Sequence, residues 1–262
     1  MAQTAATNHT SNPGNGATSS KRPGALRAQA KMTIHTEKAR RLTDPVTLPN
    51  GIRPPGLFRF SSLCQQLCEK SAKGDPYADW FLYRIEQELF KLKNRIKQST
   101  DRLQKFIEDS GFEVSEASSQ KPVTIELTMG NPYGYMAAYV LADFDRLVRL
   151  ALTCELMGIL DRAQCRNMIQ PSEKNFRRLL HLPINYKHTG VTRNDIQQNN
   201  QVAQRAIELM GECPGNIVTG KHKPRHAPSR QTSLAEVKIT RKGRPKYSPK
   251  SRSDVHEPPA NP

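Results

Sequence analysis

The feature that most constrains the fold is a long apolar pattern between Asp75 and about Glu108. Apolar side chains recur there at alternating three- and four-residue steps, interrupted only by Ser99, which is the period of one helix face. Asp75-Pro76 supplies an N-cap followed by proline at the first helical position. A helix with so narrow an apolar seam either packs within its own fold or associates with another helix as a coiled-coil-like hairpin. The seam residues are Leu82, Ile85, Leu89, Leu92, Ile96, Leu103 and Phe106, and Lys91, Lys93, Arg95 and Lys97 flank them.

Apolar spacing and capping residues predict further helices on both sides of this one. The stretch 57–72 is expected to be helical and to end at Lys73-Gly74. Asn131-Pro132 begins a helix that runs to about Ile159, and shorter helices are expected at 161–169 and 172–181. Thr192, with Asp195 three residues later, predicts a capping box for a last helix that stops at Gly211. The residues of the helix after Pro132 that we expect to face inward are Met136, Tyr139, Val140, Phe144, Leu147, Val148 and Leu152.

Two short segments, 31–36 and 122–129, alternate apolar and polar residues as strands do. Because a lone strand leaves its backbone groups unpaired, the two are expected to form one ribbon, either within the chain or across a dimer. If the apolar residues from Val123 to Met129 pack inward, then Thr124, Glu126 and Thr128 point outward. The sequence therefore predicts a mainly α fold with a small two-stranded β-ribbon.

Charge divides the chain into three regions. Residues 1–56 carry eight Lys or Arg against two Asp or Glu, 212–262 carry eleven against four, and 57–211 carry twenty-one against eighteen. The hydrophobic content of 36% is low for a fully folded chain. We expect a disordered arm at 1–24, a helical domain with the ribbon at 25–211, and a disordered basic tail at 212–262. Basic arms favour a polyanion, since each neutralised phosphate releases counterions.

Catalytic and membrane functions find no support in the pattern. No HExxH, GxSxG, Walker or dinucleotide-binding motif is present, so we expect no enzyme, no cofactor and no metal site. The sequence contains no apolar run of about 18 residues, so we expect no transmembrane helix. The five cysteines are odd in number and show no CxxC spacing, which is typical of reduced thiols in a cytosolic protein. Asp143 and Asp145 are expected to form ion pairs with Arg146 and Arg149 on the helix surface.

The segment Thr240–Arg252 resembles an AT-hook at its core, Lys242-Gly243-Arg244-Pro245-Lys246. In that motif Gly lets the backbone approach the floor of the minor groove, Pro keeps the chain extended, and the flanking cations occupy a narrow A·T groove. The alternative is a basic tail that binds without preference for sequence. Both interpretations make Lys242, Arg244 and Lys246 candidate DNA-binding residues.

The ribbon itself is a second candidate for DNA contact. A two-stranded ribbon fits the major groove of B-DNA. Thr can hydrogen-bond to several base edges and Glu can accept from cytosine N4, whereas Lys and Arg beside them would hold phosphates. The alternative is a ribbon that only closes the hydrophobic core. The candidate residues of this region are Lys31, Thr33, His35, Arg40, Arg41, Thr124, Glu126 and Thr128.

Four stretches of the chain carry a resemblance to a known family. They read GALRAQAKMTIHTEKARRL, DPYADWFLYRIEQEL, NPYGYMAAYVLADFDRLVRLALTCELMGILDR and LLHLPINYKHTGVTRNDI, spread over about 25–210. Together they resemble the integrating conjugative element protein family of bacterial mobile elements, related to the plasmid transfer regulator AcaB of the ribbon-helix-helix type. The resemblance implies a ribbon-helix-helix-like element, here embedded in a larger helical domain.

The functional hypothesis follows from the basic arms, the ribbon and this resemblance. It is a non-enzymatic, DNA-binding regulator of conjugative transfer genes on an integrative and conjugative element, acting as a homodimer on double-stranded DNA in the bacterial cytoplasm, at the nucleoid. Proteins of the transcription or conjugation machinery are further candidate partners. The alternative is a scaffold or accessory protein of conjugation or element maintenance that docks a protein through the seam 82–106 and binds nucleic acid loosely.

Overall fold

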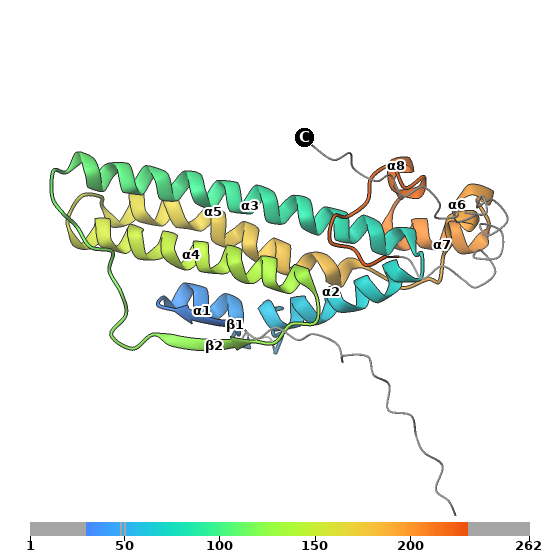
Figure 1. Cartoon of the computed structure of the whole chain (residues 1–262), viewed down its shortest axis with the longest axis horizontal. Helices are drawn as coiled ribbons and strands as arrows, with labels where there is room; N and C mark the ends of the chain where they lie inside the picture. Colours follow the sequence, from blue (N-terminus) through green and yellow to red (C-terminus); the bar gives the residue numbers. More distant parts are fainter. Residues whose placement is uncertain (1–29, 48, 50, 230–262) are drawn as a thin grey trace, which may run out of the picture.

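The computed structural model describes residues 30–229 except positions 48 and 50, and this part of the chain is mainly helical with one small antiparallel sheet. The elements, in chain order, are β1 (Ala30–Ile34), α1 (Glu37–Thr43), α2 (Leu57–Ala72), α3 (Pro76–Asp109), β2 (Val123–Leu127), α4 (Pro132–Leu156), α5 (Arg162–His181), the 3-10 helix η1 (Leu182–Asn185), α6 (Arg193–Gln198), α7 (Gln201–Met210) and α8 (Gly215–Val218). Helices α3, α4 and α5 form a long bundle, with α6, α7 and α8 at one end of it (Figure 1). The expected combination of a mainly helical fold and a two-stranded ribbon is confirmed.

Helix α3 is the long helix that the apolar seam predicts. The carboxylate of Asp75 caps it by accepting hydrogen bonds from the backbone N–H groups of Tyr77 and Ala78, at 2.9 and 3.2 Å. The first six seam residues, from Leu82 to Leu103, are at most 3% exposed and pack into the main core. The seam therefore packs within the fold, and it is not available for self-association or for docking a partner.

Phe106 departs from that pattern, because 41% of its surface is exposed. At about 100° per residue, its position is rotated by about 40° out of the sector that the six buried seam residues occupy. This rotation places Phe106 at the edge of the buried stripe near the end of α3, so its expected inward orientation is wrong.

Helix α4 lies between α3 and the ribbon (Figure 1). Asn131 caps it by accepting a hydrogen bond from the N–H of Gly134 at 3.0 Å, and its own amide nitrogen donates to the carbonyl of Ser61 in α2 at 2.9 Å. A Cβ at Gly134 would lie 2.4 Å from the Oγ of Ser61, so only glycine permits this approach. The turn from β2 into α4 is thereby held against α2.

Two α4 residues that were expected to face inward are exposed. Tyr139 is 65% and Leu152 41% exposed, whereas Val140, Phe144, Leu147 and Val148 are buried. The buried side of α4 faces α3, α5, α2, α1 and β1. Tyr139 lies one residue, or about 100°, before the buried Val140. The buried stripe of α4 is therefore narrower than the sequence predicts.

The two helices expected at 161–169 and 172–181 are one continuous helix, α5, with Pro171 inside it. Apolar side chains on both sides of Pro171, including Ile169 and Phe176, are buried in the main core. Their burial outweighs the hydrogen bond that proline removes. The sequence predicts two separate helices here, whereas the packing of α5 keeps the helix continuous through Pro171.

The last expected helix is divided into α6 and α7. The capping box of Thr192 and Asp195 is present, as predicted. Asn199, however, adopts a left-handed conformation with φ of 49°, and Asn200 caps α7 by accepting from the N–H of Ala203 at 3.1 Å. Asparagine tolerates this conformation better than most residues, so the Asn-Asn pair ends one helix and starts another.

The folded body continues past the boundary expected at residue 211. Helix α8 packs against α3, and the backbone N–H groups of Arg225 and His226 each donate to the buried carboxylate of Glu86 at 3.0 Å. Tyr83 stacks on His222 at 5.6 Å between ring centroids. Residues 212–229 therefore belong to the folded body, where a disordered tail was expected. No helix in the part that the structure describes is long and apolar enough to cross a membrane.

Candidate nucleic-acid interface

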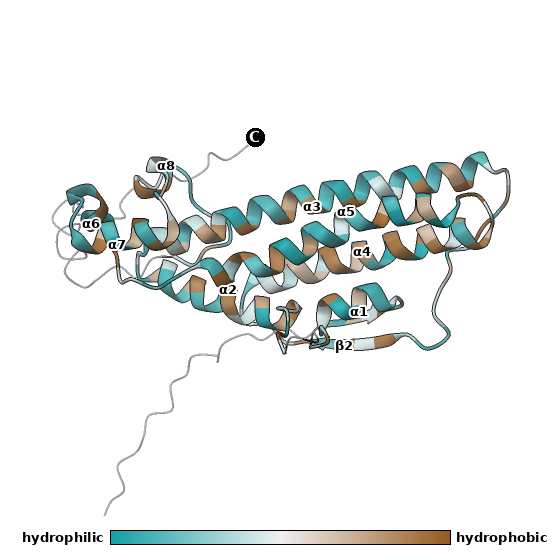
Figure 2. Cartoon of the chain, turned by 180° about the vertical axis from the view of Figure 1, so that it is seen from behind, coloured by the Kyte–Doolittle hydropathy of each residue, from teal (hydrophilic) through white to brown (hydrophobic). Residues whose placement is uncertain are grey.

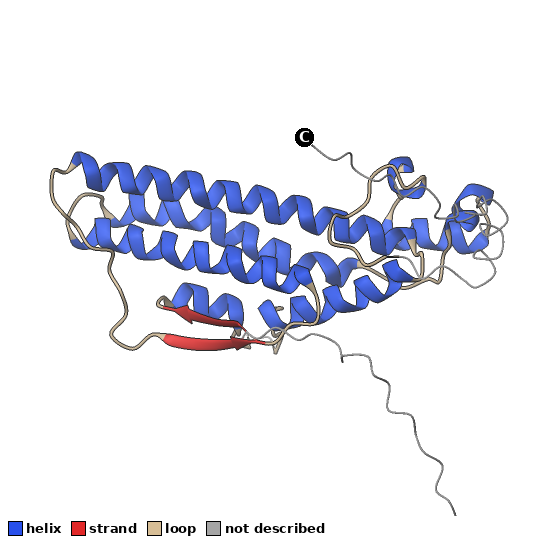
Figure 3. Ribbon diagram, viewed as in Figure 1, coloured by secondary structure: helices blue, strands red, loops and turns tan. Residues whose placement is uncertain are grey.

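The ribbon forms within one chain. Strands β1 and β2 pair antiparallel with Lys31 opposite Glu126 and Thr33 opposite Thr124 (Figure 3). Of the two arrangements that the sequence left open, the structure has the intrachain one. The separation of about 90 residues between the strands explains why local sequence patterns could not identify the partner.

One face of the ribbon belongs to the hydrophobic core. Met32, Ile34 and Leu127 are 8%, 2% and 4% exposed and pack with the helices. Ile125 is half-buried, whereas Val123, the first residue of β2, is 44% exposed. The predicted strand phase is therefore confirmed along most of the ribbon, although Val123 does not pack inward.

The opposite face of the ribbon is open to solvent and polar. It brings together Lys31, Thr33, Thr124 and Glu126, all of them exposed candidates from the sequence. The ammonium of Lys31 lies 3.2 Å from a carboxylate oxygen of Glu126, and both side chains are more than 70% exposed. So exposed an ion pair contributes little stability, and both groups stay available to a ligand. Thr128 is exposed just after β2.

Helix α1 follows the ribbon directly and carries Arg40 and Arg41. Both guanidinium groups donate to the carboxylate of Glu37, at distances of 2.7 to 3.0 Å. Hydrogen bonds from Arg40 and then Arg41 lower the pKa of Glu37 to about 2. Glu37 is thus ionised at neutral pH and offsets part of the charge of the two arginines beside the ribbon.

His35 is placed differently from the rest of the candidate set. Its ring is half-buried, and its Nδ1 accepts a hydrogen bond from the N–H of Ser119 at 3.3 Å. Its backbone N–H donates to Asp145 at 3.0 Å. His35 therefore joins β1 to the loop before β2 and to α4, and it is not part of the open face.

Asp145 holds the junction between β1 and α1. It is 3% exposed, and its carboxylate accepts from the N–H of His35, the N–H of Thr36 and the hydroxyl of Thr36, at 3.0, 2.9 and 2.7 Å. The sequence reasoning missed this role. The available signal was the position of Asp145 on the apolar face of its helix, four residues after Leu141 and three before Val148.

The ion pairs expected within α4 do not form. Arg146 and Arg149 both pair with Glu116 of the loop before β2, at 2.8 and 3.4 Å. Asp145 is turned away from Arg149 because it is buried against Thr36. The expected surface pairs are therefore wrong, and the two arginines instead fasten the loop that leads into β2.

Lys242, Arg244 and Lys246 lie outside the described residues, so the AT-hook-like segment stays a prediction. Within the described part, no group of three or more His, Cys, Asp or Glu side chains is arranged to hold a metal ion. Burial raises the pKa of Cys68 to about 11 and that of Cys213 to about 12. These thiols are therefore protonated at neutral pH and poorly nucleophilic.

Comparisons with known proteins complete the description. The family model described as transcriptional regulator AcaB matches residues 22–230. The chain is also similar to the crystal structure of selenomethionine-containing AcaB from uropathogenic E. coli, with a TM-score of 0.52 and 13% sequence identity, over 76% of this chain and 97% of that one. At this identity the likeness concerns the fold. No curated protein sequence matches significantly.

Proposed function

Because the chain belongs to the family of the transcriptional regulator AcaB, we propose that it binds double-stranded DNA and regulates transcription through this contact. The observation that carries the proposal is the open polar face of the ribbon, whose other face is anchored in the core. A ribbon anchored in this way can enter the major groove without losing its hydrophobic packing.

In this proposal the exposed strand residues read bases and the cations beside them hold phosphates. Thr33 and Thr124 lie opposite each other and present two hydroxyls to base edges, and Glu126 accepts from cytosine N4 after leaving Lys31. Lys31 then joins the arginines of α1 at the phosphates. Thr128 extends the reading face, and His35 supports it by holding the loop before β2.

The proposed ribbon-helix-helix element differs from one in which the strands of two subunits pair. We keep a ribbon followed by helices, but with both strands from one chain, so a homodimer would need an interface other than strand pairing. Two-fold symmetry would still place two ribbons on two half-sites of an operator. The homodimer is proposed on that symmetry argument.

The biological setting is proposed from the sequence resemblance to proteins of integrative and conjugative elements. In it the chain is a non-enzymatic regulator of conjugative transfer genes, acting in the bacterial cytoplasm at the nucleoid. Its arms, which include Lys242, Arg244 and Lys246, would add phosphate or minor-groove contacts.

The test measures binding of the full chain to promoter fragments of its own element and to random duplex, at about 0.15 M salt. A sequence-specific regulator is expected to prefer one fragment by about a thousandfold or more. A ratio near one would contradict the proposal and favour the alternative, a scaffold of the conjugation or maintenance machinery with loose nucleic-acid binding.

A further inference from the structure

The C-terminal half of α3 concentrates positive charge in an otherwise balanced body. Residues 91–105 carry six Lys or Arg and one Asp, a net charge of +5, whereas the whole stretch 57–211 has twenty-one Lys or Arg against eighteen Asp or Glu. The rest of that stretch is therefore slightly negative. The concentration lies in the C-terminal half of α3, the longest helix of the described part.

Most of these cations have no partner among the described residues. Lys91 pairs with Glu88 at 2.9 Å. The others are exposed, and no ion pair or hydrogen bond of their side chains is found within the described part of the chain. We call these five unpaired cations, taken together, the α3 ridge: Lys93, Arg95, Lys97, Arg102 and Lys105.

Two pairs of these cations are spaced unfavourably for the helix alone. Lys91 and Arg95 are four residues apart, as are Lys93 and Lys97. Like charges at this spacing repel each other and destabilise a helix. A bound polyanion would attract both cations of each pair and so offset their repulsion. This is the physical reason for inferring such a ligand here.

The two flanks of α3 are shallow grooves lined by further arginines. Between α3 and α5, a groove of about 280 Å³ is lined by Arg95 and by Arg178, which is also exposed and has no ion-pair partner in the described structure. Between α3 and α4, a groove of about 240 Å³ is lined by Lys93, Lys97 and Arg146.

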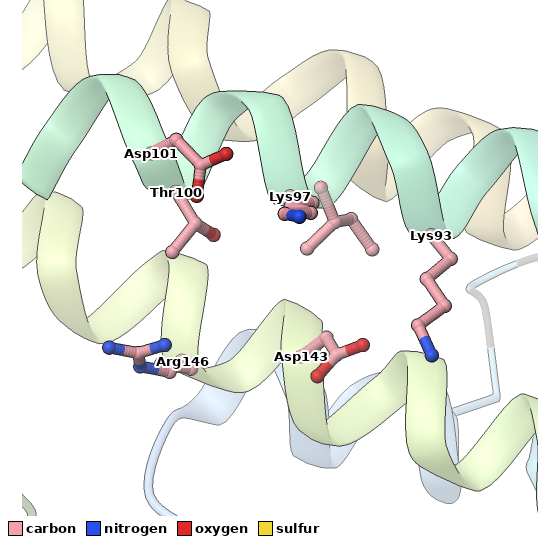
Figure 4. Close-up of a pocket in the computed structure, with 7 residues that line it drawn as sticks. Lys93, Lys97, Thr100, Asp101, Asp143 and Arg146 are labelled. Atoms are coloured by element: carbon pink, nitrogen blue, oxygen red, sulfur yellow. The ribbon is translucent and has the colours of Figure 1, made fainter.

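Figure 4 shows this second groove, where the carboxylates of Asp101 and Asp143 share the space with the cations. Neither carboxylate lies within ion-pair distance of Lys93 or Lys97 in the described structure. The α3–α4 groove is thus nearly balanced, and the excess of positive charge lies on the α5 side of α3, where Arg95 and Arg102 are seven residues apart on one flank.

Helix α3 and the ribbon lie on opposite sides of the bundle. Both the front and the back views place α3 along one edge and the ribbon along the other, with α4 between them (Figures 1 and 2). The stretch from Lys93 to Lys105 spans about 18 Å of helix, the length of about five base pairs. Because α3 and the ribbon lie on opposite sides, one straight duplex bound on the ribbon would not reach the α3 ridge.

We propose that the α3 ridge is a second DNA-contacting surface, which binds the sugar–phosphate backbone of a duplex without reading its sequence. The inference rests on the proposed function in taking duplex DNA as the ligand. One molecule then holds an operator on its ribbon and a second duplex segment on α3, so that it bridges two segments of DNA.

The test compares the wild-type full chain with a ridge variant that carries Lys93→Gln, Arg95→Gln, Lys97→Gln and Arg102→Gln. A matched control removes the same charge elsewhere, through Arg162→Gln, Arg166→Gln, Lys187→Gln and Arg205→Gln, all exposed positions. Each protein is loaded on an immobilised operator duplex, and capture of a labelled random duplex is measured against salt.

The ridge variant should lose tenfold or more of this capture and keep its sequence preference on the operator. The slope of log affinity against log salt for the second duplex should fall by about two to four. Its melting temperature should not drop, because repulsion within α3 has been removed. The control variant should retain capture close to the wild-type level.

Wild-type capture and salt slope in the ridge variant would overturn the inference. A ridge variant that loses binding only to duplex RNA would also overturn it, in favour of an RNA surface. These outcomes differ from failure of the proposed function, in which wild-type protein shows no preference for any operator fragment.

Discussion

At the residue scale, a single buried carboxylate determines how the ribbon meets the helices. Asp145 accepts three hydrogen bonds from the His35–Thr36 junction, where β1 ends and α1 begins. Hydrogen bonds to a charged acceptor are stronger than neutral ones, and orphaned buried donors are costly. The open face of the ribbon and the arginines of α1 are therefore oriented by a buried residue that lies outside that face.

Removing this carboxylate should destabilise the protein. Asp145→Ala leaves two backbone donors without acceptors, so the free energy of unfolding should fall by about 2–4 kcal/mol. Asp143→Ala, two residues away and without an ion pair in the described structure, serves as the control and should change it by less than about 0.5 kcal/mol. Chemical denaturation measures both, and equal effects would contradict the role of Asp145.

Glu37 should weaken DNA binding by competing with phosphates for Arg40 and Arg41. Glu37→Gln is expected to raise the affinity for all duplexes by about two- to tenfold. Since the pKa of Glu37 is about 2, the carboxylate is ionised throughout the neutral range and the gain should be the same at about pH 5.5 and about pH 8. Glu113→Gln, at an exposed position, controls for net charge; an equal gain there would count against the competition.

At the element scale, periodicity predicts the secondary structure of each segment but not which segments pack against each other. Alternation identified both strands and the exposed positions Thr33 and Thr124, because that pattern is local. Strand pairing, the continuity of α5 through Pro171 and the docking of residues 225–226 on Glu86 depend on contacts distant in sequence. Asp145 was misjudged for the same reason, since its partners lie about 110 residues earlier.

The buried seam of α3 offers a test of the packing at this scale. Leu103→Ala removes a side chain that is fully buried in the main core and should lower the free energy of unfolding by about 2–5 kcal/mol. Phe106→Ala, three residues later and 41% exposed, should cost less than about 1.5 kcal/mol. The reverse order in thermal or urea unfolding would show that the seam continues to Phe106.

At the scale of the whole molecule, a helical body carries two polar surfaces, the open face of the ribbon and the α3 ridge. In the sequence, basic arms flank this body. Because the charge of the body is nearly balanced, we expect contacts with DNA to be local to these surfaces and to the basic arms. We propose that the ribbon face reads sequence and that the cations hold phosphates, a division of roles suited to a member of a transcriptional regulator family.

The basic tail should add affinity without setting the main sequence preference. Replacing Lys242, Arg244 and Lys246 by Ala is expected to weaken binding to every duplex and to lower the salt slope by about two to three. A loss confined to A·T-rich duplex would identify a minor-groove hook, and a uniform loss a non-specific tail. Unchanged affinity and slope would exclude both interpretations.

The central claim is that the open face of the ribbon reads DNA sequence, and the specificity ratio of a ribbon variant tests it most directly. Thr33→Ala with Thr124→Ala removes the two facing hydroxyls, and Thr47→Ala with Ser118→Ala is the control at exposed positions. With the melting temperature unchanged, the ratio of operator to random-duplex affinity should fall by about tenfold or more in the ribbon variant alone. An undiminished ratio would contradict the account.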